Sequence, residues 1–411
     1  MLKKILIHET LLNLTSFRFY LIVVLLAIMF FGGLFVNIGN YKTRLAEYNE
    51  TIAANDSFHV AVPPNPLSVF AEGADQYSSM AVVMDDIQIG RLSVKSLGKS
   101  NVSLRMSAFS VLDFNFAVKV LLSLGAIFIT FESISGERFS GILKLTCASG
   151  VPKRHIILGK ILSSFLCLAI PFIIFTVISC LVLAANNMLA TFADIIRVLL
   201  FTLFSLIYIL FFLLAGLIIS ISTRRPQESL ITGMMFWLLL TFILPALIPY
   251  ASNLLAALPS PRAMEEARTQ RWVATMFETV HSTDRELDAR SRLDDMQAEN
   301  ESDWEKARNQ FDYHAKTKRI LDFLSPSDIY NNASTEIVGS GLQNALHARD
   351  AILRHKNNIL KDPRSGFAFK RAAFVSDLIP AITSMLILCL VISVLMLVAY
   401  RQFMLLDLRE G

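Results

Sequence analysis

Three polar side chains lie within one long apolar run in the first third of this 411-residue chain. Asn115 and Lys119 are four positions apart, which places them on one face of a helix, and Glu132 lies near the other end of the run. Polar groups inside a membrane are costly and mark ligand pathways or moving elements. Asn115 and Lys119 are therefore candidate residues of a polar pathway, and Glu132 is a candidate for transmitting movement. Alternatively, Lys119 extends its ammonium to the outer interface and has only a structural role.

The pair Gly159-Lys160 raises the question of nucleotide hydrolysis. A phosphate-binding P-loop has Ser or Thr directly after its lysine and another glycine five positions before the second one. In this chain those positions hold Ile161 and Arg154. We therefore expect no ATP hydrolysis by this chain, and expect Gly159 to permit close packing at the start of a helix.

The histidines of the C-terminal half do not follow a metal-binding pattern. No His-Glu-x-x-His motif occurs, and His347 and His355 are eight positions apart, which is too far along a helix to share one metal ion. The many charges around them are typical of a solvated helix surface. We predict no catalytic residue, no metal site and no directly bound cofactor.

Composition indicates a membrane protein. Hydrophobic residues make up 54% of the chain and charged residues 18%, and the apolar residues gather in runs that are long enough to cross a bilayer. The net charge of +4 is too small to indicate a nucleic-acid partner. All four cysteines fall in predicted spans or in one predicted inner loop, so no disulfide framework is expected outside.

The predicted fold is an all-α polytopic membrane protein with six spans. The spans are expected at residues 17–38, 114–134, 156–184, 195–222, 228–250 and 378–400. Residues 1–16 predict an amphipathic helix on the inner surface, or alternatively a polar lead-in. Residues 39–112 predict a small external α+β domain with a helix near 41–54, and residues 251–377 predict a larger external helical domain with two long helices packed within 262–320.

The distribution of basic residues predicts that both termini are cytoplasmic. Lysine and arginine recur in the short segments assigned to the inner side, including the tail 401–411, whereas the short outer loop 185–193 has none. The two long outer segments do carry basic residues, but long translocated segments escape this rule.

Residues 135–155, which we call the connector, join the second and third spans. A charged pair, Glu137-Arg138, opens it, a short amphipathic helix is expected at 139–147, and Gly150 with Pro152 ends that helix. Such a helix, lying parallel to the membrane, can transmit a rigid-body movement from a soluble motor. Spacing alone leaves open the alternative of an inert basic loop that only sets topology.

The stretch 137–160 resembles the ABC type-2 permease family. The register matches without gaps, at Glu137, Arg138, Gly141, Leu143, Leu145, Val151, Ile156, Leu158, Gly159 and Lys160. The chain departs from the family pattern at Ile142, Lys144 and Gly150, and Pro152 comes two residues late. The departure at Lys144 puts the charge of the docking surface in doubt. Residues 63–69, 324–326 and 338–341 resemble a subgroup with large external loops.

The resemblance implies a permease of the bacterial inner membrane, most members being exporters. It implies a separate cytoplasmic ATPase that binds ATP and magnesium, and a second permease subunit, identical or different. The residues expected to couple permease and ATPase are Glu132, Glu137, Arg138, Gly141, Leu143, Lys144, Leu145, Gly150, Val151, Pro152, Gly159 and Lys160. The alternative function is a membrane-anchored scaffold or sensor whose external helical domain binds a periplasmic or cell-surface partner; an exporter that hands its cargo to such a partner combines the two. The sequence does not predict the substrate.

Overall fold

The computed structural model describes most of the chain as helix. The described residues are 2–53, 59–75, 82–85, 93–96, 113–189, 191–258, 260, 266–267, 269–275, 277, 287–359, 367, 369–371 and 374–406. Contacts divide the chain into two compact units. Unit 1 comprises residues 1–241 and 326–411, and unit 2 comprises residues 242–325.

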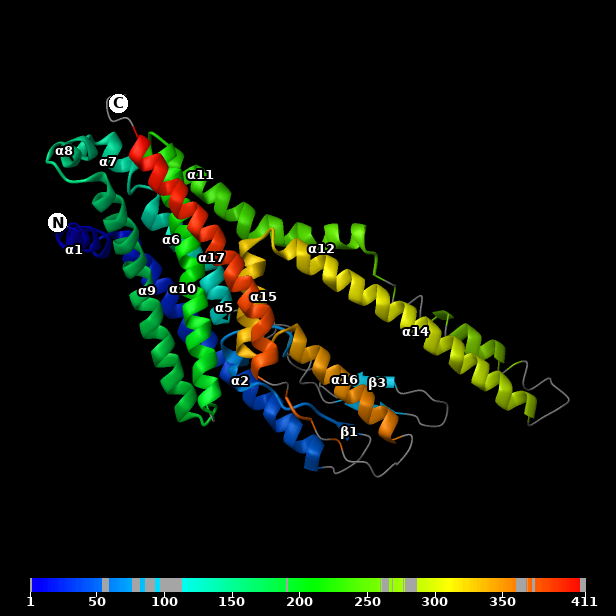
Figure 1. Ribbon diagram of the computed structural model, residues 1–411. Helices are drawn as coiled ribbons and strands as arrows, with labels where there is room; N and C mark the ends of the chain where they lie inside the picture. The colour runs from blue at the N-terminus through cyan, green and yellow to red at the C-terminus, as the bar shows by residue number, and fades with distance from the viewer. Residues whose placement is uncertain are drawn as a thin grey trace. The chain divides into compact units, whose positions relative to one another are not determined.

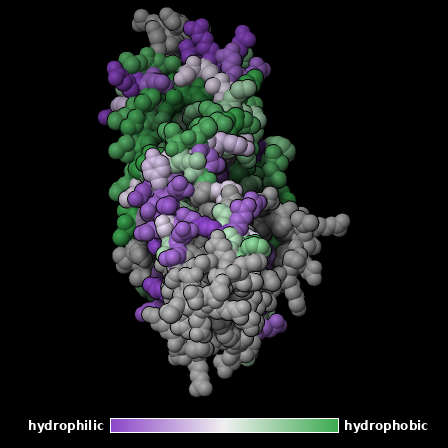
Figure 2. Space-filling view, turned by 90° about the vertical axis from the view of Figure 1, so that its right-hand side faces the viewer, coloured by the Kyte–Doolittle hydropathy of each residue, from purple (hydrophilic) through white to green (hydrophobic). Residues whose placement is uncertain are grey.

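Six helical segments in the described part of the chain are long and apolar enough to cross a membrane, as predicted. They are Phe17–Ala53, Phe114–Phe139, Lys153–Ala185, Phe192–Ser222, Pro226–Leu255 and Leu378–Leu405. The first of these, α2 (Phe17–Ala53), continues well beyond the predicted span, so the helix expected near 41–54 is its last part. Figure 2 shows the apolar side chains of one face as a green band, with hydrophilic residues gathered above it.

Besides α2, unit 1 contains the helices that form the other spans and several shorter helices (Figure 1). They are α1 (Leu2–Leu14), α5 (Phe114–Phe116), α6 (Ser123–Thr130), α7 (Ser135–Phe139), α8 (Ile142–Ala148), α9 (Lys153–Ala185), α10 (Phe192–Ser222), α11 (Pro226–Leu238), α15 (Pro326–Val338), α16 (Leu342–Ile359) and α17 (Phe374–Leu405). Residues between α2 and α5 form the 3-10 helix η1 (Pro66–Val69) and three short antiparallel strands in the order β1 (His59–Val60), β2 (Val82–Asp85) and β3 (Ser93–Ser96).

Aromatic side chains fill the middle of unit 1. Phe30 of α2 packs edge-on against Phe114 with 4.3 Å between ring centroids, and Phe70 packs against the same ring at 4.8 Å. Tyr330 of α15 stacks on Tyr208 of α10 at 4.4 Å. These aromatic residues come from segments that are far apart in the sequence. Their packing therefore joins the spans to α15 and to the segment after η1.

Two short π-helical segments interrupt the spans and expose carbonyl groups that side chains satisfy. They are η3 (Ala117–Leu122) and η4 (Leu239–Ile243). The Tyr208 hydroxyl donates to the Lys119 carbonyl at 3.3 Å, and the Ser327 hydroxyl donates to the Leu240 carbonyl at 2.7 Å. Such bulges commonly mark functional positions in helices.

One of the two divisions between the units, after residue 325, falls inside segment 251–377, which the sequence predicts as one external domain. Helix α15 belongs to unit 1, where Ile329, Tyr330 and Ala333 are buried and its side chains contact α10 and the second span. Unit 2 contains the end of η4, α12 (Leu244–Leu255) and the long α14 (Leu287–Asp322). Within it, Arg271 of the helical stretch 269–275 pairs with Asp303 of α14 at 2.5 Å, which joins two helices of the region predicted at 262–320.

Candidate functional site

The connector, the end of α10 and the C-terminal end of α17 lie at the same end of unit 1 (Figure 1). Lys153, at the start of α9, donates to the carbonyls of Met404 and Leu406 at 3.3 Å and 3.0 Å. These carbonyls end α17, and a cation at the C-terminus of a helix is stabilised by the helix dipole. The connector is thereby held against the last span.

A buried serine stabilises the break between α6 and α7. The Ser220 hydroxyl of α10 accepts from the amides of Ile134 and Ser135 at 3.1 Å and 3.0 Å and donates to the Phe131 carbonyl at 2.8 Å. The two amides that the helix break would leave without partners are satisfied by one side chain. This fixes the direction in which the connector leaves the second span.

Two glycines set the limits of α8, which corresponds to the later part of the helix predicted at 139–147. Gly141 precedes α8 with φ +77°, and Gly150 follows it with φ +78°. This left-handed conformation is favourable for glycine and strained for residues with a Cβ. Pro152 then takes the N-cap position of α9. Gly150 and Pro152 therefore end α8 and separate it from α9.

The two faces of α8 differ sharply in exposure. Leu143 is fully buried in a cluster, and Val151 packs against that cluster. The other buried members are Ile134, Ile156, Ile157, Leu217, Ile221, Ala399 and Phe403. In contrast, Leu145 is 72% exposed, and Phe139 and Ile142 are also exposed, beside exposed Lys144. We call Phe139, Ile142 and Leu145 the apolar face of the connector.

Lys160 joins three helices through two ion pairs. Its Nζ lies 2.6 Å from Oε1 of Glu137 in α7 and 2.8 Å from Oε1 of Glu9 in α1. The Lys160 side chain is 2% exposed, so the desolvated ammonium depends on both carboxylates. We call these three residues the lysine cluster. The predicted site residues Glu137 and Lys160 therefore meet, whereas Glu9 carries no pattern that a sequence argument uses.

Gly159 allows α1 to approach α9 closely. A Cβ added at Gly159 would lie 2.8 Å from Cγ2 of Ile5, which is too short for an unstrained contact. The glycine therefore serves helix packing beside the lysine cluster. Residues 2–14 do form a helix, as predicted, although Glu9 and Ile5 face α9 while Ile7 and Leu11 are exposed.

Glu132, at the end of the second span, pairs with Arg18 near the start of the first one. The Arg18 guanidinium also lies over the ring of Phe131, 4.6 Å from its centroid. Both charged side chains are partly exposed. This connection between the first two spans could not be predicted, because no sequence pattern pairs Arg18 with a residue 114 positions away.

Asn115 and Lys119 belong to the opposite part of the second span. The Asn115 side chain donates to Oδ1 of Asn331 and accepts from the Ser334 hydroxyl, both at 2.7 Å. Asn115 is buried, and its side chain bonds to residues of α15. Among the described contacts, none joins Asn115 to the connector.

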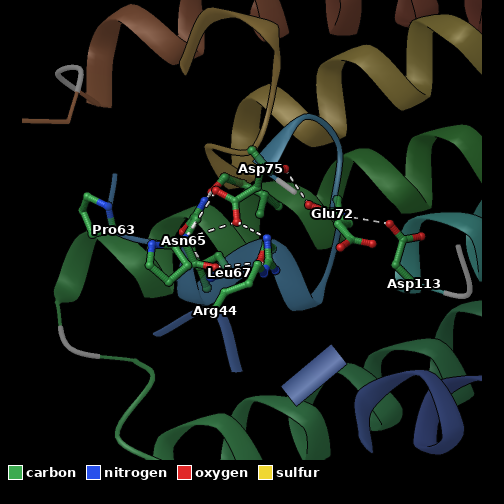
Figure 3. A network of polar contacts seen from close by, with 12 residues as sticks. Arg44, Pro63, Asn65, Leu67, Glu72, Asp75 and Asp113 are labelled. Carbon is green, nitrogen blue, oxygen red and sulfur yellow. Dashed lines mark hydrogen bonds and ion pairs between the residues drawn. The ribbon is translucent and has the colours of Figure 1, made fainter. Parts of the chain in front are cut away.

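A polar network beside the N-terminal end of the second span brings together two sequence segments that resemble the subgroup with large loops. Asn65 donates to the Val338 carbonyl at 3.0 Å, and the Ser340 hydroxyl donates to the Ala71 carbonyl at 2.5 Å. Figure 3 shows Asp75 between Arg44 and Asn65; the Arg44 Nη1 is 2.9 Å from its carboxylate. Burial raises the pKa of Asp75, and the nearby Arg44 opposes that shift.

Asp113 ends this network at the start of α5. Its carboxylate accepts from the amides of Phe116 at 2.7 Å and Glu72 at 2.9 Å (Figure 3). Desolvation raises the pKa of Asp113 to about 7, against the lowering effect of these two hydrogen bonds. The carboxyl group therefore titrates near neutral pH.

No group of three or more metal-ligating side chains is found in the part of the chain that the structure describes. The fold and this end of unit 1 define a polytopic membrane protein with a short, firmly packed helix whose exposed face is apolar.

Comparison with known families identifies the class further. The model of the ABC-2 family transporter proteins matches residues 4–408, which is almost the entire chain. The chain therefore belongs to the ABC-2 transporter family and is a membrane permease component of an ABC transporter. Among curated proteins, none matches it significantly.

Proposed function

We propose that the chain is the permease subunit of an exporter, that both termini are cytoplasmic, and that the connector docks on a separate ATPase. The observation that carries this proposal is the apolar face of the connector. Phe139, Ile142 and Leu145 are exposed next to polar residues, at an end of the molecule where hydrophilic side chains gather. Large apolar side chains grouped at a surface in this way mark an interaction site.

The inner face of the same helix supports a coupling role. Leu143 is packed among residues of the third, fourth and sixth spans, so a push on α8 moves those spans together with it. The lysine cluster adds a connection to α1, and Lys153 adds one to the end of α17. Residues on the two faces of α8 therefore have different roles: Leu145 contacts the ATPase, and Leu143 transmits the movement of α8 to the spans.

The partner proposed here binds ATP and magnesium, and a second permease subunit, identical or different, completes the transport pathway. Lys144 lies beside the apolar face, where the family usually has an acidic residue. We therefore propose an acidic groove on the ATPase. The resemblance of residues 63–69, 324–326 and 338–341 supports placement in the subgroup with large external loops.

Copurification tests the docking role. The full chain is expressed with an affinity tag in its native host, and the recovered ATPase is identified by its P-loop sequence and quantified by mass spectrometry. Leu145→Asp should lower the recovered ATPase by about tenfold, since a buried interface residue contributes about 1–2 kcal/mol. Ser222→Asp, at an exposed position in the last turn of α10, is the matched control and should leave recovery unchanged.

Equal ATPase recovery with Leu145→Asp and with the wild-type chain would disprove docking through this face. A combined variant, Phe139→Asp with Leu145→Asp, extends the test to both ends of the face. Size-exclusion profiles in detergent confirm that each variant remains folded.

A second candidate function, binding of a periplasmic or cell-surface partner, is favoured by the compactness of unit 2. Residues 242–325 form a separate cluster of contacts, with His314 bonded to the Ala256 carbonyl at 2.7 Å. The full chain and a form in which residues 263–320 are replaced by a short linker would be compared in a pulldown from the host envelope. A protein that is recovered with the full chain but not with the shortened form supports this function. Recovery of the same proteins with both forms contradicts it.

A further inference from the structure

An apolar groove lies between the first, second and fifth spans within unit 1. Its volume is about 290 Å³. Its walls are formed by Leu21, Leu25, Leu121, Leu124, Phe128 and Leu230. At its floor is Gly125, where an added Cβ would lie 3.2 Å from Cγ2 of Ile22. Leu21 and Leu25 are 49% and 41% exposed, so the groove is open along its side.

One end of the groove is charged and the rest is not. Arg18 and Phe131 line this end, and Arg18 pairs there with Glu132. Each side chain of the pair is more than 40% exposed, so both remain accessible to a ligand that enters the groove. The pair offers a planar donor group that suits phosphate and a carboxylate that accepts hydrogen bonds from an ammonium.

The length of the groove fits half of a bilayer. Arg18 and Leu25 are seven residues apart, or about 10 Å along a helix, and Leu121 and Phe131 are ten residues apart, or about 15 Å. One leaflet contributes about 15 Å of the hydrocarbon thickness. The charged end thus lies at an interface when the apolar end lies near the bilayer centre.

We propose that this groove is a binding site for one phosphatidylethanolamine molecule, with an acyl chain against Gly125, the phosphate on Arg18 and the ammonium on Glu132. A zwitterionic headgroup with a hydrogen-bonding ammonium is complementary to the Arg18–Glu132 pair. An anionic headgroup that bound the Arg18 guanidinium would leave the Glu132 carboxylate without a counter-charge, whereas the ammonium of a zwitterionic headgroup supplies one. Placement in the inner leaflet rests on the proposed cytoplasmic location of the termini, whereas the binding itself does not depend on an ATPase.

Lipid retention measured by native mass spectrometry tests the site. The full chain is reconstituted into nanodiscs of equimolar phosphatidylethanolamine and phosphatidylglycerol, then released into mild detergent. The wild-type chain should retain phosphatidylethanolamine in preference to phosphatidylglycerol. Arg18→Gln should reduce this retention by about tenfold, the value of one charge-assisted hydrogen bond. Glu132→Gln should abolish the preference while some phosphatidylglycerol still binds to Arg18.

Filling the groove provides a variant that keeps the ion pair. Leu121→Trp should lower the retained phosphatidylethanolamine by about tenfold, since the loss of one well-buried chain segment costs more than 1 kcal/mol. Leu199→Trp, at a position that is 64% exposed on α10 and outside the groove, is the matched control and should retain the lipid. Equal retention of both lipids by the wild-type chain, or undiminished retention by Leu121→Trp, would overturn the proposal. Loss of retained phosphatidylethanolamine by Leu121→Trp with intact ATPase copurification separates this site from the docking role of the connector.

Discussion

The Lys160 ammonium is bonded at 2.8 Å to the carboxylate of Glu9, 151 positions earlier in the chain, as well as to Glu137. This relationship links the N-terminal helix to the connector through the third span. We expect the three helices to move together. Separating any one of them would leave a charged group without its partner where water solvates it poorly.

The first prediction concerns this lysine cluster. Lys160→Met should destabilise the protein by about 2–3 kcal/mol, because it leaves two partly exposed carboxylates facing each other without a cation. The triple variant Lys160→Met, Glu9→Gln, Glu137→Gln should recover most of that loss, since it removes all the charges together. Thermal unfolding in detergent, followed by intrinsic fluorescence, measures both. An unfolding temperature for Lys160→Met equal to that of the wild-type chain would show that the cluster carries little energy.

The second prediction separates the two faces of α8. Leu143→Ala should cost about 2–4 kcal/mol of stability, because Leu143 is fully buried and its truncation leaves a cavity. Leu145→Ala, two positions on and 72% exposed, should change stability by less than about 0.5 kcal/mol. The two leucine variants differ only in position, so each is the control for the other. Similar unfolding temperatures for the pair would contradict the assigned orientation of the helix.

The third prediction is a pH dependence at Asp113. Its pKa of about 7 in the folded chain lies above the ordinary value of 3.8, so the folded state holds a proton that the unfolded state releases. The contribution of this group to stability is complete below about pH 4 and is lost as the pH rises through about 7. Unfolding temperatures should therefore show a decline between pH 5 and 8 that is shallower in Asp113→Asn.

The comparison for Asp113 uses Asp303→Asn. A hydrogen bond from Arg271 lowers the pKa of Asp303, so its stabilising effect is present above the ordinary pKa and fades on acidification. This variant should leave the slope between pH 5 and 8 as in the wild-type chain. A slope that is equally steep in Asp113→Asn and in the wild-type chain would exclude Asp113 as its origin.

The spans could be predicted from the sequence because hydrophobic length is a local property. The break after α8 was also visible, since Gly150 and Pro152 disfavour helix wherever they occur. The contacts that join α1 to α9 could not be predicted, because they pair residues 151 positions apart and neither Glu9 nor Ile5 differs from an ordinary helix residue. Ser220 was missed for the same reason, lying 85 positions from the amide of Ser135.

The segment 251–377 shows what the polarity of a sequence leaves open. Helix α15 has many polar residues, such as Asn331 and Ser334, and the sequence assigns it to the predicted external domain. In the structure these two side chains are bonded to Asn115, and the Tyr330 hydroxyl lies 2.8 Å from that of Ser205. Polar groups with mutual partners can be buried at low cost, so composition alone does not separate a buried helix from an exposed one.

The last prediction uses the close approach of α1 to α9. Gly159→Ala adds a methyl group 2.8 Å from the Ile5 side chain and should destabilise the protein by about 1–2 kcal/mol through overpacking. In an Ile5→Ala background the space is open, and the same substitution should then stabilise by up to about 1 kcal/mol, because alanine favours helix more than glycine does. Unfolding temperatures of the four proteins form a double-mutant cycle. The sign of the Gly159→Ala effect should reverse between the two backgrounds, and the same sign in both would show that α1 does not rest on Gly159.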